Sequence, residues 1–99
     1  RMSTRENNNK TASREMVVQN QLGLHARPAA MFVKMATRFK SEIFVVKEGE
    51  EINGKSIMGL MMLAATQGTQ LTLMVEGEDS EQAVIRIMQL FSNRFGEEE

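Results

Sequence analysis

The sequence predicts an α+β domain in which helices cover one face of a single antiparallel sheet. Residues 71–75 alternate apolar and polar side chains, which is typical of a strand with one buried face. Three other segments carry apolar residues at helical spacing, so each has one face to bury. The predicted strands are too short to be buried on both faces, and a chain of 99 residues forms one hydrophobic core. We therefore expect one domain with an open sheet face.

The domain is expected to span residues 16–96, between two polar tails. Residues 1–15 contain three consecutive asparagines and almost no apolar side chain. Such a segment cannot bury enough surface to offset the entropy lost on ordering, so we expect a disordered tail. Arg1 precedes Met2, which indicates that the first residue is a remnant of cloning. Residues 97–99 are all Glu and are expected to form an acidic tail.

The first half of the domain is predicted to form a strand, a helix and two further strands. Residues 16–18 alternate as a short half-buried strand does. An apolar stripe at helical spacing predicts a helix over residues 26–39. The stripe consists of Phe32, Val33, Ala36 and Phe39. β-Branched residues predict a second strand over residues 43–46, and a short third strand at residues 51–52 precedes an Asn-Gly turn.

The second half is predicted to form a helix, a strand and a last helix. Ser56 can cap a short helix that extends to about Leu63. The last helix is predicted to open with Asp79 and Gln82 in capping-box spacing and to end at Gly96. Its apolar stripe consists of Val84, Ile87, Met88 and Phe91. The predicted order is therefore strand, helix, strand, strand, helix, strand, helix.

The composition excludes several classes of function. The chain has 12 basic and 13 acidic residues, and its formal net charge of −1 provides no basic excess for nucleic acid or for an anionic membrane. The absence of cysteine and the single histidine exclude disulfides and Cys- or His-rich metal sites, and no cofactor is expected. No apolar run is long enough to span a bilayer. The sequence therefore predicts a soluble cytoplasmic protein.

The single histidine, His25, lies where a predicted loop passes into the first helix. A helix N-terminus has unpaired N–H groups and the positive end of the helix dipole, so it favours phosphate. The backbone N–H groups of Ala26 and Arg27 are candidates for this contact, and Pro28 fits the first turn because its nitrogen needs no acceptor. The planar guanidinium of Arg27 can hold phosphate oxygens. These positive groups oppose protonation of the ring, which leaves a lone pair to attack phosphorus.

The sequence lacks the other groups that phosphoryl chemistry requires. No general acid or second carboxylate is expected near His25, and the Gly-Lys-Ser segment 54–56 lacks the upstream glycine of a nucleotide-binding P-loop. A domain that accepts a phosphoryl group, but cannot bind or activate its donor, depends on other proteins for both steps. The sequence therefore predicts a phosphoryl carrier that is a substrate of partner enzymes and not an independent catalyst.

Two blocks of sequence connect this chain with a known family. Residues 23–29 read Gly-Leu-His-Ala-Arg-Pro-Ala, and residues 54–59 read Gly-Lys-Ser-Ile-Met-Gly. Over roughly Met16 to Phe95, the chain resembles HPr, the histidine-containing phosphocarrier of the bacterial phosphoenolpyruvate phosphotransferase system. The resemblance implies an open-faced sandwich of order βαββαβα, with a four-stranded antiparallel sheet and three helices on one face.

The resemblance also implies a set of partners. A first enzyme charged by phosphoenolpyruvate would give its phosphoryl group to Nδ1 of His25, and a sugar-specific or regulatory acceptor subunit would take it. In the matching Lys-Ser-Ile-Met context, an HPr kinase phosphorylates the serine, which is Ser56 here. The alternative is that Ser56 only caps the second helix, which contributes ~1 kcal/mol.

The short second helix carries more apolar side chains than it can bury. We expect Ile57, Met58 and Met61 to form a partner-docking patch, and Met62 and Leu63 to fill the core. Methionine surfaces repack easily, which suits a monomer that meets several partners through transient contacts.

The open face of the sheet is expected to be unusually apolar. Phe44, Val46 and Met74 should point away from the helices, so weak self-association or a partner could cover them.

Three other functions compete with that of a carrier for sugar uptake. A carrier of the nitrogen-related phosphotransferase branch would have the same features. A purely regulatory HPr-like module needs no histidine, so the presence of His25 argues against it. An RNA-binding α+β domain is disfavoured because the chain has neither Trp nor Tyr, and no aromatic-rich strand.

Overall fold

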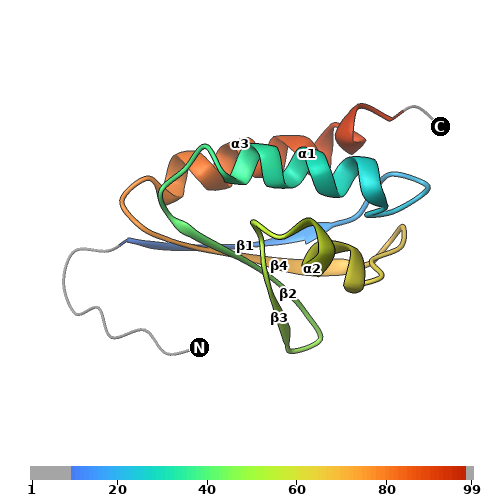
Figure 1. Cartoon of the computed structure of the whole chain (residues 1–99), viewed down its shortest axis with the longest axis horizontal. Coiled ribbons are helices and arrows are strands. Elements are labelled where there is room, and N and C mark those ends of the chain that lie inside the picture. Colours follow the sequence, from blue (N-terminus) through green and yellow to red (C-terminus); the bar gives the residue numbers. More distant parts are fainter. Residues whose placement is uncertain (1–9, 98–99) are drawn as a thin grey trace.

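Four strands form one antiparallel sheet in the order β1-β4-β2-β3 in the computed structural model, which describes residues 10–97 (Figure 1). The strands are β1 (Thr11–Val17), β2 (Glu42–Lys47), β3 (Glu50–Asn53) and β4 (Gln70–Glu76). The helices are α1 (Ala26–Ala36), α2 (Ile57–Met62) and α3 (Ser80–Ser92), and the 3-10 turn η1 (Arg94–Gly96) follows α3. The predicted order βαββαβα and the four-stranded open sheet are confirmed.

The hydrophobic core lies between the sheet and the helices α1 and α3, which run side by side over one face (Figure 1). The inward residues of β4 are buried, as their alternation predicted; they are Leu71, Leu73 and Val75. Phe32 of α1 and Phe91 of α3 meet edge to face, with ring centroids 6.1 Å apart. The third helix of the domain, α2, packs against α1 and β3.

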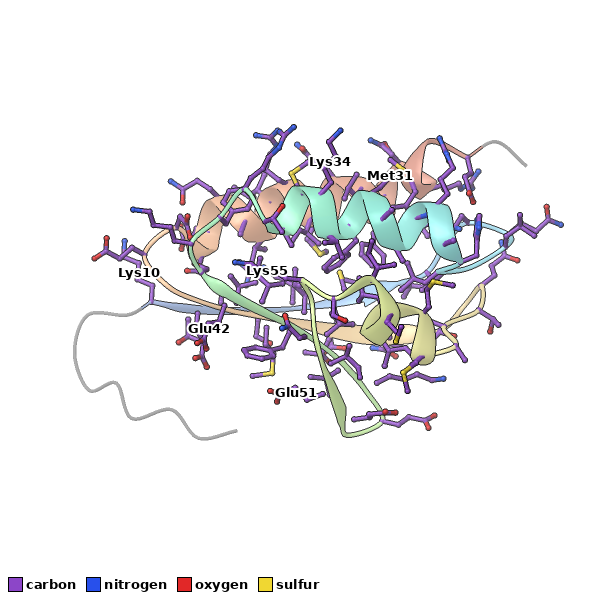
Figure 2. All side chains as sticks on the ribbon, viewed as in Figure 1. Lys10, Met31, Lys34, Glu42, Glu51 and Lys55 are labelled. Atoms are coloured by element: carbon purple, nitrogen blue, oxygen red, sulfur yellow. The ribbon has the colours of Figure 1, made fainter. Side chains whose placement is uncertain are left out.

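The opposite face of the sheet is open, with the predicted side chains on it. Alternate residues of β2 are buried under the helices, whereas Phe44 and Val46 point the other way and are half-buried. Met74 of β4 is also half-buried and pairs with Phe44 in the antiparallel register. Figure 2 places Glu42 on this open side of the sheet and Lys34 on the outer side of α1.

β1 begins at Thr11, so the predicted start of the domain at Met16 is corrected. The strand pairs with β4 along its whole length, but it is an edge strand and Met16 is its only fully buried residue. Backbone hydrogen bonds therefore order a segment whose side chains give no apolar signal. The disordered tail predicted for residues 1–9 lies outside the described residues, as do residues 98–99 of the predicted acidic tail.

The first helix is shorter than predicted. α1 ends at Ala36, and the Thr37 hydroxyl donates to the Lys34 carbonyl at 3.0 Å. Such local hydrogen bonds from threonine compete with continuation of a helix. Phe39 therefore lies in the following turn, where it still packs partly against the core.

The capping box predicted from Asp79 and Gln82 is wrong. The Asp79 side chain makes no cap hydrogen bond to α3. Its carboxylate instead accepts the backbone N–H groups of Lys40 at 2.9 Å and Ser41 at 3.0 Å, together with the Ser41 hydroxyl. The bond from that hydroxyl is the main reason that the pKa of Asp79 lies below its ordinary value of 3.8; burial opposes the shift and the two N–H groups add to it.

Candidate active site at the start of α1

The loop before α1 is fixed against the segment that follows α2. Gly23 has a φ of +73°, and a Cβ there would lie 2.5 Å from the Ala65 carbonyl oxygen, so only glycine allows this close approach. The Leu24 N–H donates to the same oxygen at 2.9 Å. Asn20, which is fully buried, donates from Nδ2 to the Gly23 carbonyl at 2.7 Å. The loop therefore presents the next residue, His25, in a defined position.

His25 is the N-cap residue of α1, as its place in the sequence predicted. Its backbone is extended, and its carbonyl accepts the Ala29 N–H at 3.0 Å. The imidazole makes no cap hydrogen bond to the helix and is 37% exposed. The N–H groups of Ala26 and Arg27 belong to the first turn, where no acceptor within the helix is available. An anion beside the ring would therefore meet the positive end of α1.

Arg27 lies beside the ring, but its guanidinium already has protein partners. Nη1 donates to the Phe95 carbonyl at 3.5 Å and lies 3.5 Å from Oε2 of Glu97. Both contacts are long, and the Arg27 side chain is 59% exposed. Long contacts on an exposed side chain are weak, so phosphate oxygens could replace them.

Asn20 and Glu97 are site residues that the sequence did not predict. Oε2 of Glu97 lies 2.7 Å from Nε2 of His25, and Oε1 accepts Nδ2 of Asn20 at 2.9 Å. The Glu97 side chain is only 14% exposed. Glu97 is therefore not part of a solvated acidic tail, and the expectation that no carboxylate lies near His25 is wrong.

A left-handed turn after α3 carries Glu97 back to the start of α1. Arg94, Phe95 and Gly96 have φ values of 58°, 53° and 74°. Phe95 anchors this turn, since it is 1% exposed and packs on Phe91 with ring centroids 4.9 Å apart. A Phe-Gly pair just beyond a helix was the available signal, because the phenylalanine needs burial and glycine favours a left-handed reversal.

The Glu97 carboxyl is held in its ionised form. Burial raises its pKa, but hydrogen bonds from Asn20 and His25, with the charges of His25 and Arg27, outweigh this and place the pKa below its ordinary value of 4.5. An ionised carboxylate can only accept hydrogen bonds. In the 2.7 Å contact Nε2 of His25 is therefore the donor.

Ser56 is the N-cap residue of α2, which confirms its predicted structural role. Its Oγ accepts the Gly59 N–H at 3.0 Å. One residue earlier, the Lys55 N–H donates to the Asn53 side chain at 2.8 Å, so a second side chain supports the turn into the helix.

The predicted docking residues lie on the exposed side of α2. The exposed apolar side chains of this helix, called the α2 patch below, are Ile57, Met58, Met61 and Met62. Met62 is 69% exposed, so the prediction that it fills the core is wrong, whereas Leu63 is buried as predicted. A helix of fewer than two turns can direct few positions inward, and in α2 the buried residue is Leu60. The helix α2 packs against α1, and the chain just after α2 is bonded to the His25 loop, so the α2 patch lies on an element next to the site.

Within residues 10–97, no helix is long and apolar enough to cross a membrane. In the same part of the chain, no group of three or more His, Asp or Glu side chains is placed to hold a metal ion.

Comparison with known proteins identifies the family. The family described as "PTS HPr component phosphorylation site" matches residues 12–93. Phosphocarrier protein HPr of Xylella fastidiosa (strain 9a5c) is 45% identical, over 85% of this chain and 94% of the relative. HPr-like protein Crh of Bacillus subtilis (strain 168) is 50% identical, over 71% of this chain and 82% of the length of that relative. The crystal structure of HPr-C-His from Thermoanaerobacter tengcongensis superposes with a TM-score of 0.86 at 43% identity, covering 89% of this chain and 99% of that chain. The chain therefore belongs to the HPr family of phosphocarrier proteins of the phosphotransferase system.

Proposed function

We propose that this protein carries a phosphoryl group on His25, from the phosphoenolpyruvate-charged first enzyme of the phosphotransferase system to a sugar-specific or regulatory acceptor subunit. On loading, a ring nitrogen of His25 attacks phosphorus, an N–P bond forms, and the donor–phosphorus bond breaks with its electron pair left on the donor. On unloading, the acceptor's nucleophile attacks the same phosphorus, and His25 is the leaving group.

The observation that supports this proposal best is an exposed imidazole at the N-terminus of α1 with Arg27 beside it. The end of a helix stabilises an anion by about 0.3–1 kcal/mol, and a charge-assisted hydrogen bond contributes about 1.5–3 kcal/mol. Arg27 is thus the larger of the two contributions. Both can stabilise a phosphoryl group once it is on His25, which fits a carrier.

In this proposal the protein is a substrate of its partner enzymes and needs no cofactor of its own. It acts in the cytoplasm as a monomer of 11.2 kDa. The α2 patch is its docking surface for the first enzyme and the acceptors, since exposed methionines and an isoleucine adjoin the site.

A second phosphorylation, on Ser56 by an HPr kinase, is proposed as regulation. The hydroxyl of Ser56 is at the N-cap of α2, where a phosphate is compatible with the helix. The added charge would lie at the edge of the α2 patch, next to Ile57, and would weaken docking to an acidic partner surface.

Two other functions within the family differ in their partners or in the use of His25. A carrier of the nitrogen-related branch would use the same site with a different first enzyme. A purely regulatory module would leave His25 unused, and the exposure of its ring argues against this.

Labelling with radioactive phosphoenolpyruvate tests the proposal. Wild-type protein incubated with purified first enzyme should gain an acid-labile phosphoryl group, and His25→Ala should gain none while keeping its circular dichroism spectrum. Gln19→Ala, an exposed residue of the same loop, serves as the control and should be labelled normally. Retained labelling of His25→Ala would refute the assignment. First enzymes of both branches, used in parallel, distinguish sugar uptake from nitrogen regulation.

A further inference from the structure

The two ring nitrogens of His25 have different surroundings. Nε2 lies 2.7 Å from the Glu97 carboxylate, whereas no group within residues 10–97 forms a hydrogen bond with Nδ1. We propose that Glu97 and Asn20 are positioning residues that hold the His25 proton on Nε2 and leave Nδ1 as the nucleophile. This inference rests on the proposed function of His25. The resemblance to HPr already implies Nδ1 as the reacting atom, and the inference names the two residues that select it.

The carboxylate determines the tautomer because it has no proton to donate. A neutral imidazole carries one N–H group and one lone pair, and the nitrogen that faces an ionised carboxylate keeps the proton. Asn20 holds the carboxylate in place through its other oxygen, at 2.9 Å, and Asn20 is itself fixed by its bond to the Gly23 carbonyl. The lone pair therefore stays on Nδ1.

Glu97 also compensates the charge that the reaction creates on the ring. When Nδ1 attacks phosphorus and the bond to the donor breaks, the ring keeps its Nε2 proton and becomes cationic. No proton has to leave at this step, because the adjacent carboxylate balances the positive charge. A buried aspartate has the same role beside the histidine of serine proteases, and partner carboxylates similarly raise the basicity of metal-binding histidines.

The substitution Glu97→Gln should move the proton to the other nitrogen. Asn20 Nδ2 donates to the Gly23 carbonyl and to the side chain of residue 97. A flip of the Asn20 amide would place its own oxygen against the Gly23 carbonyl oxygen, and two acceptors repel each other. The oxygen of the new glutamine must therefore face Asn20, so its NH2 group faces Nε2 of His25. That NH2 group needs an acceptor, and Nε2 can accept only if the proton is on Nδ1. Arg27, long and exposed, can move away from the NH2 group.

Nuclear magnetic resonance of the full chain measures the proton position directly. In long-range ¹H–¹⁵N spectra a protonated ring nitrogen and one with a lone pair have well-separated ¹⁵N shifts, and the chain has a single histidine to assign. At a pH high enough to keep the ring neutral, wild type should show the proton on Nε2. Glu97→Gln should show it largely on Nδ1, and Glu97→Ala should show the mixture of a free histidine.

Phosphorylation rates provide the second readout. With the first enzyme in excess, loading of Glu97→Gln should be slower by about 10- to 100-fold, and Glu97→Ala should be affected less. Glu81→Gln, an exposed residue in the first turn of α3, makes the same change of charge away from His25 and should match wild type in both measurements.

A spectrum that is the same in wild type and Glu97→Gln would overturn the inference, and so would a shifted proton with an unchanged rate. If wild-type protein is not phosphorylated by either first enzyme, the proposed function fails instead. The spectra would still decide where Glu97 and Asn20 hold the proton, so the two failures can be told apart.

Discussion

Arg27 and Glu97 place opposite charges beside the same imidazole. The 3.5 Å between Arg27 Nη1 and Glu97 Oε2 is long for an ion pair, and the arginine side chain is largely exposed. Such a pair contributes little to stability, on the order of 0–1 kcal/mol. In the proposed phosphorylation of His25, this weak pair can open, so that the guanidinium contacts the phosphoryl oxygens while the carboxylate stays on Nε2.

Replacement of Arg27 by alanine should slow transfer to His25 by about 10- to 100-fold without unfolding the domain, because the variant loses the charge-assisted bonds to the phosphoryl oxygens. Single-turnover phosphorylation by the first enzyme measures this rate. Arg38→Ala, an exposed arginine beyond the end of α1, is the matched control and should leave the rate unchanged. An equal rate for wild type and Arg27→Ala would indicate that the backbone N–H groups of α1 suffice.

Local residues of the site could be predicted from the sequence, and distant ones could not. His25 and Arg27 are two positions apart at a predicted helix start, so the physics of a helix N-terminus was enough to place them. Asn20 precedes a loop whose path depends on Ala65, and Glu97 arrives through a turn anchored by Phe95. Both depend on tertiary contacts that hydrophobic periodicity does not encode.

Asp79 connects two elements that neighbour each other only in the folded chain. Its carboxylate, at the start of α3, accepts three hydrogen bonds from Lys40 and Ser41, immediately before β2. Gly77 allows this approach, since a Cβ there would lie 2.3 Å from the Ser41 hydroxyl oxygen. The contact therefore fixes the start of α3 against the sheet.

The substitution Asp79→Ala should lower the free energy of unfolding at neutral pH by about 1–3 kcal/mol, the range expected for losing hydrogen bonds to a charged group. The pKa of Asp79 is depressed in the folded protein, so this stabilisation is present above the ordinary value of 3.8 and is lost as the pH falls through the folded value. The difference between variant and wild type should therefore shrink in acid. Urea unfolding at about pH 7 and about pH 3 measures it.

Glu78→Ala provides the control for this pH dependence, because Glu78 is the adjacent exposed carboxylate. Its unfolding free energy should follow that of wild type at both pH values. A destabilisation by Asp79→Ala that is the same at both pH values would show that ionisation of Asp79 does not stabilise the fold.

Elements with an apolar face could be predicted from the sequence. For elements held mainly by backbone pairing, the type could be predicted but the bounds could not. β4 and α3 bury regular stripes, so their type follows from periodicity, although α3 ends at Ser92 and not at Gly96 as predicted. β1 is an edge strand in which only Met16 is fully buried, so its first residues carry no such signal. The end of α1 was also missed, because the apolar spacing continues past Ala36 to Phe39, which packs against the core from the following turn.

For the molecule as a whole, the proposed docking patch and His25 lie on neighbouring elements, because α2 packs against α1. The chain that leaves α2 is hydrogen-bonded to the loop that presents His25. A partner that covers the α2 patch therefore comes close to the reactive ring, so recognition and transfer can occur in one encounter. The fold class of this molecule followed from patterning alone, whereas the specific sandwich came from the resemblance to HPr.

The substitution Met58→Asp should weaken binding of the first enzyme by about tenfold or more, because it places a charge in the middle of an apolar contact. Met58 is 72% exposed, so the fold should not change. Isothermal titration calorimetry measures the Kd. Ile85→Asp is the matched control, since Ile85 is 57% exposed on α3 and away from α2. Equal weakening by both variants would contradict a specific docking role for the α2 patch.

Because Glu97 contacts His25, the two ends of the described segment, residues 10–97, differ in how they tolerate attached groups. η1 and the start of α1 lie at one end of the molecule, and Lys10 lies at the other (Figures 1 and 2). A purification tag or fluorescent reporter inserted directly after Glu97 would begin beside the His25 ring and would perturb the carboxylate that touches it. The same insertion just ahead of Lys10 would enter the fold far from His25, so that position is the appropriate choice for labels in transfer assays.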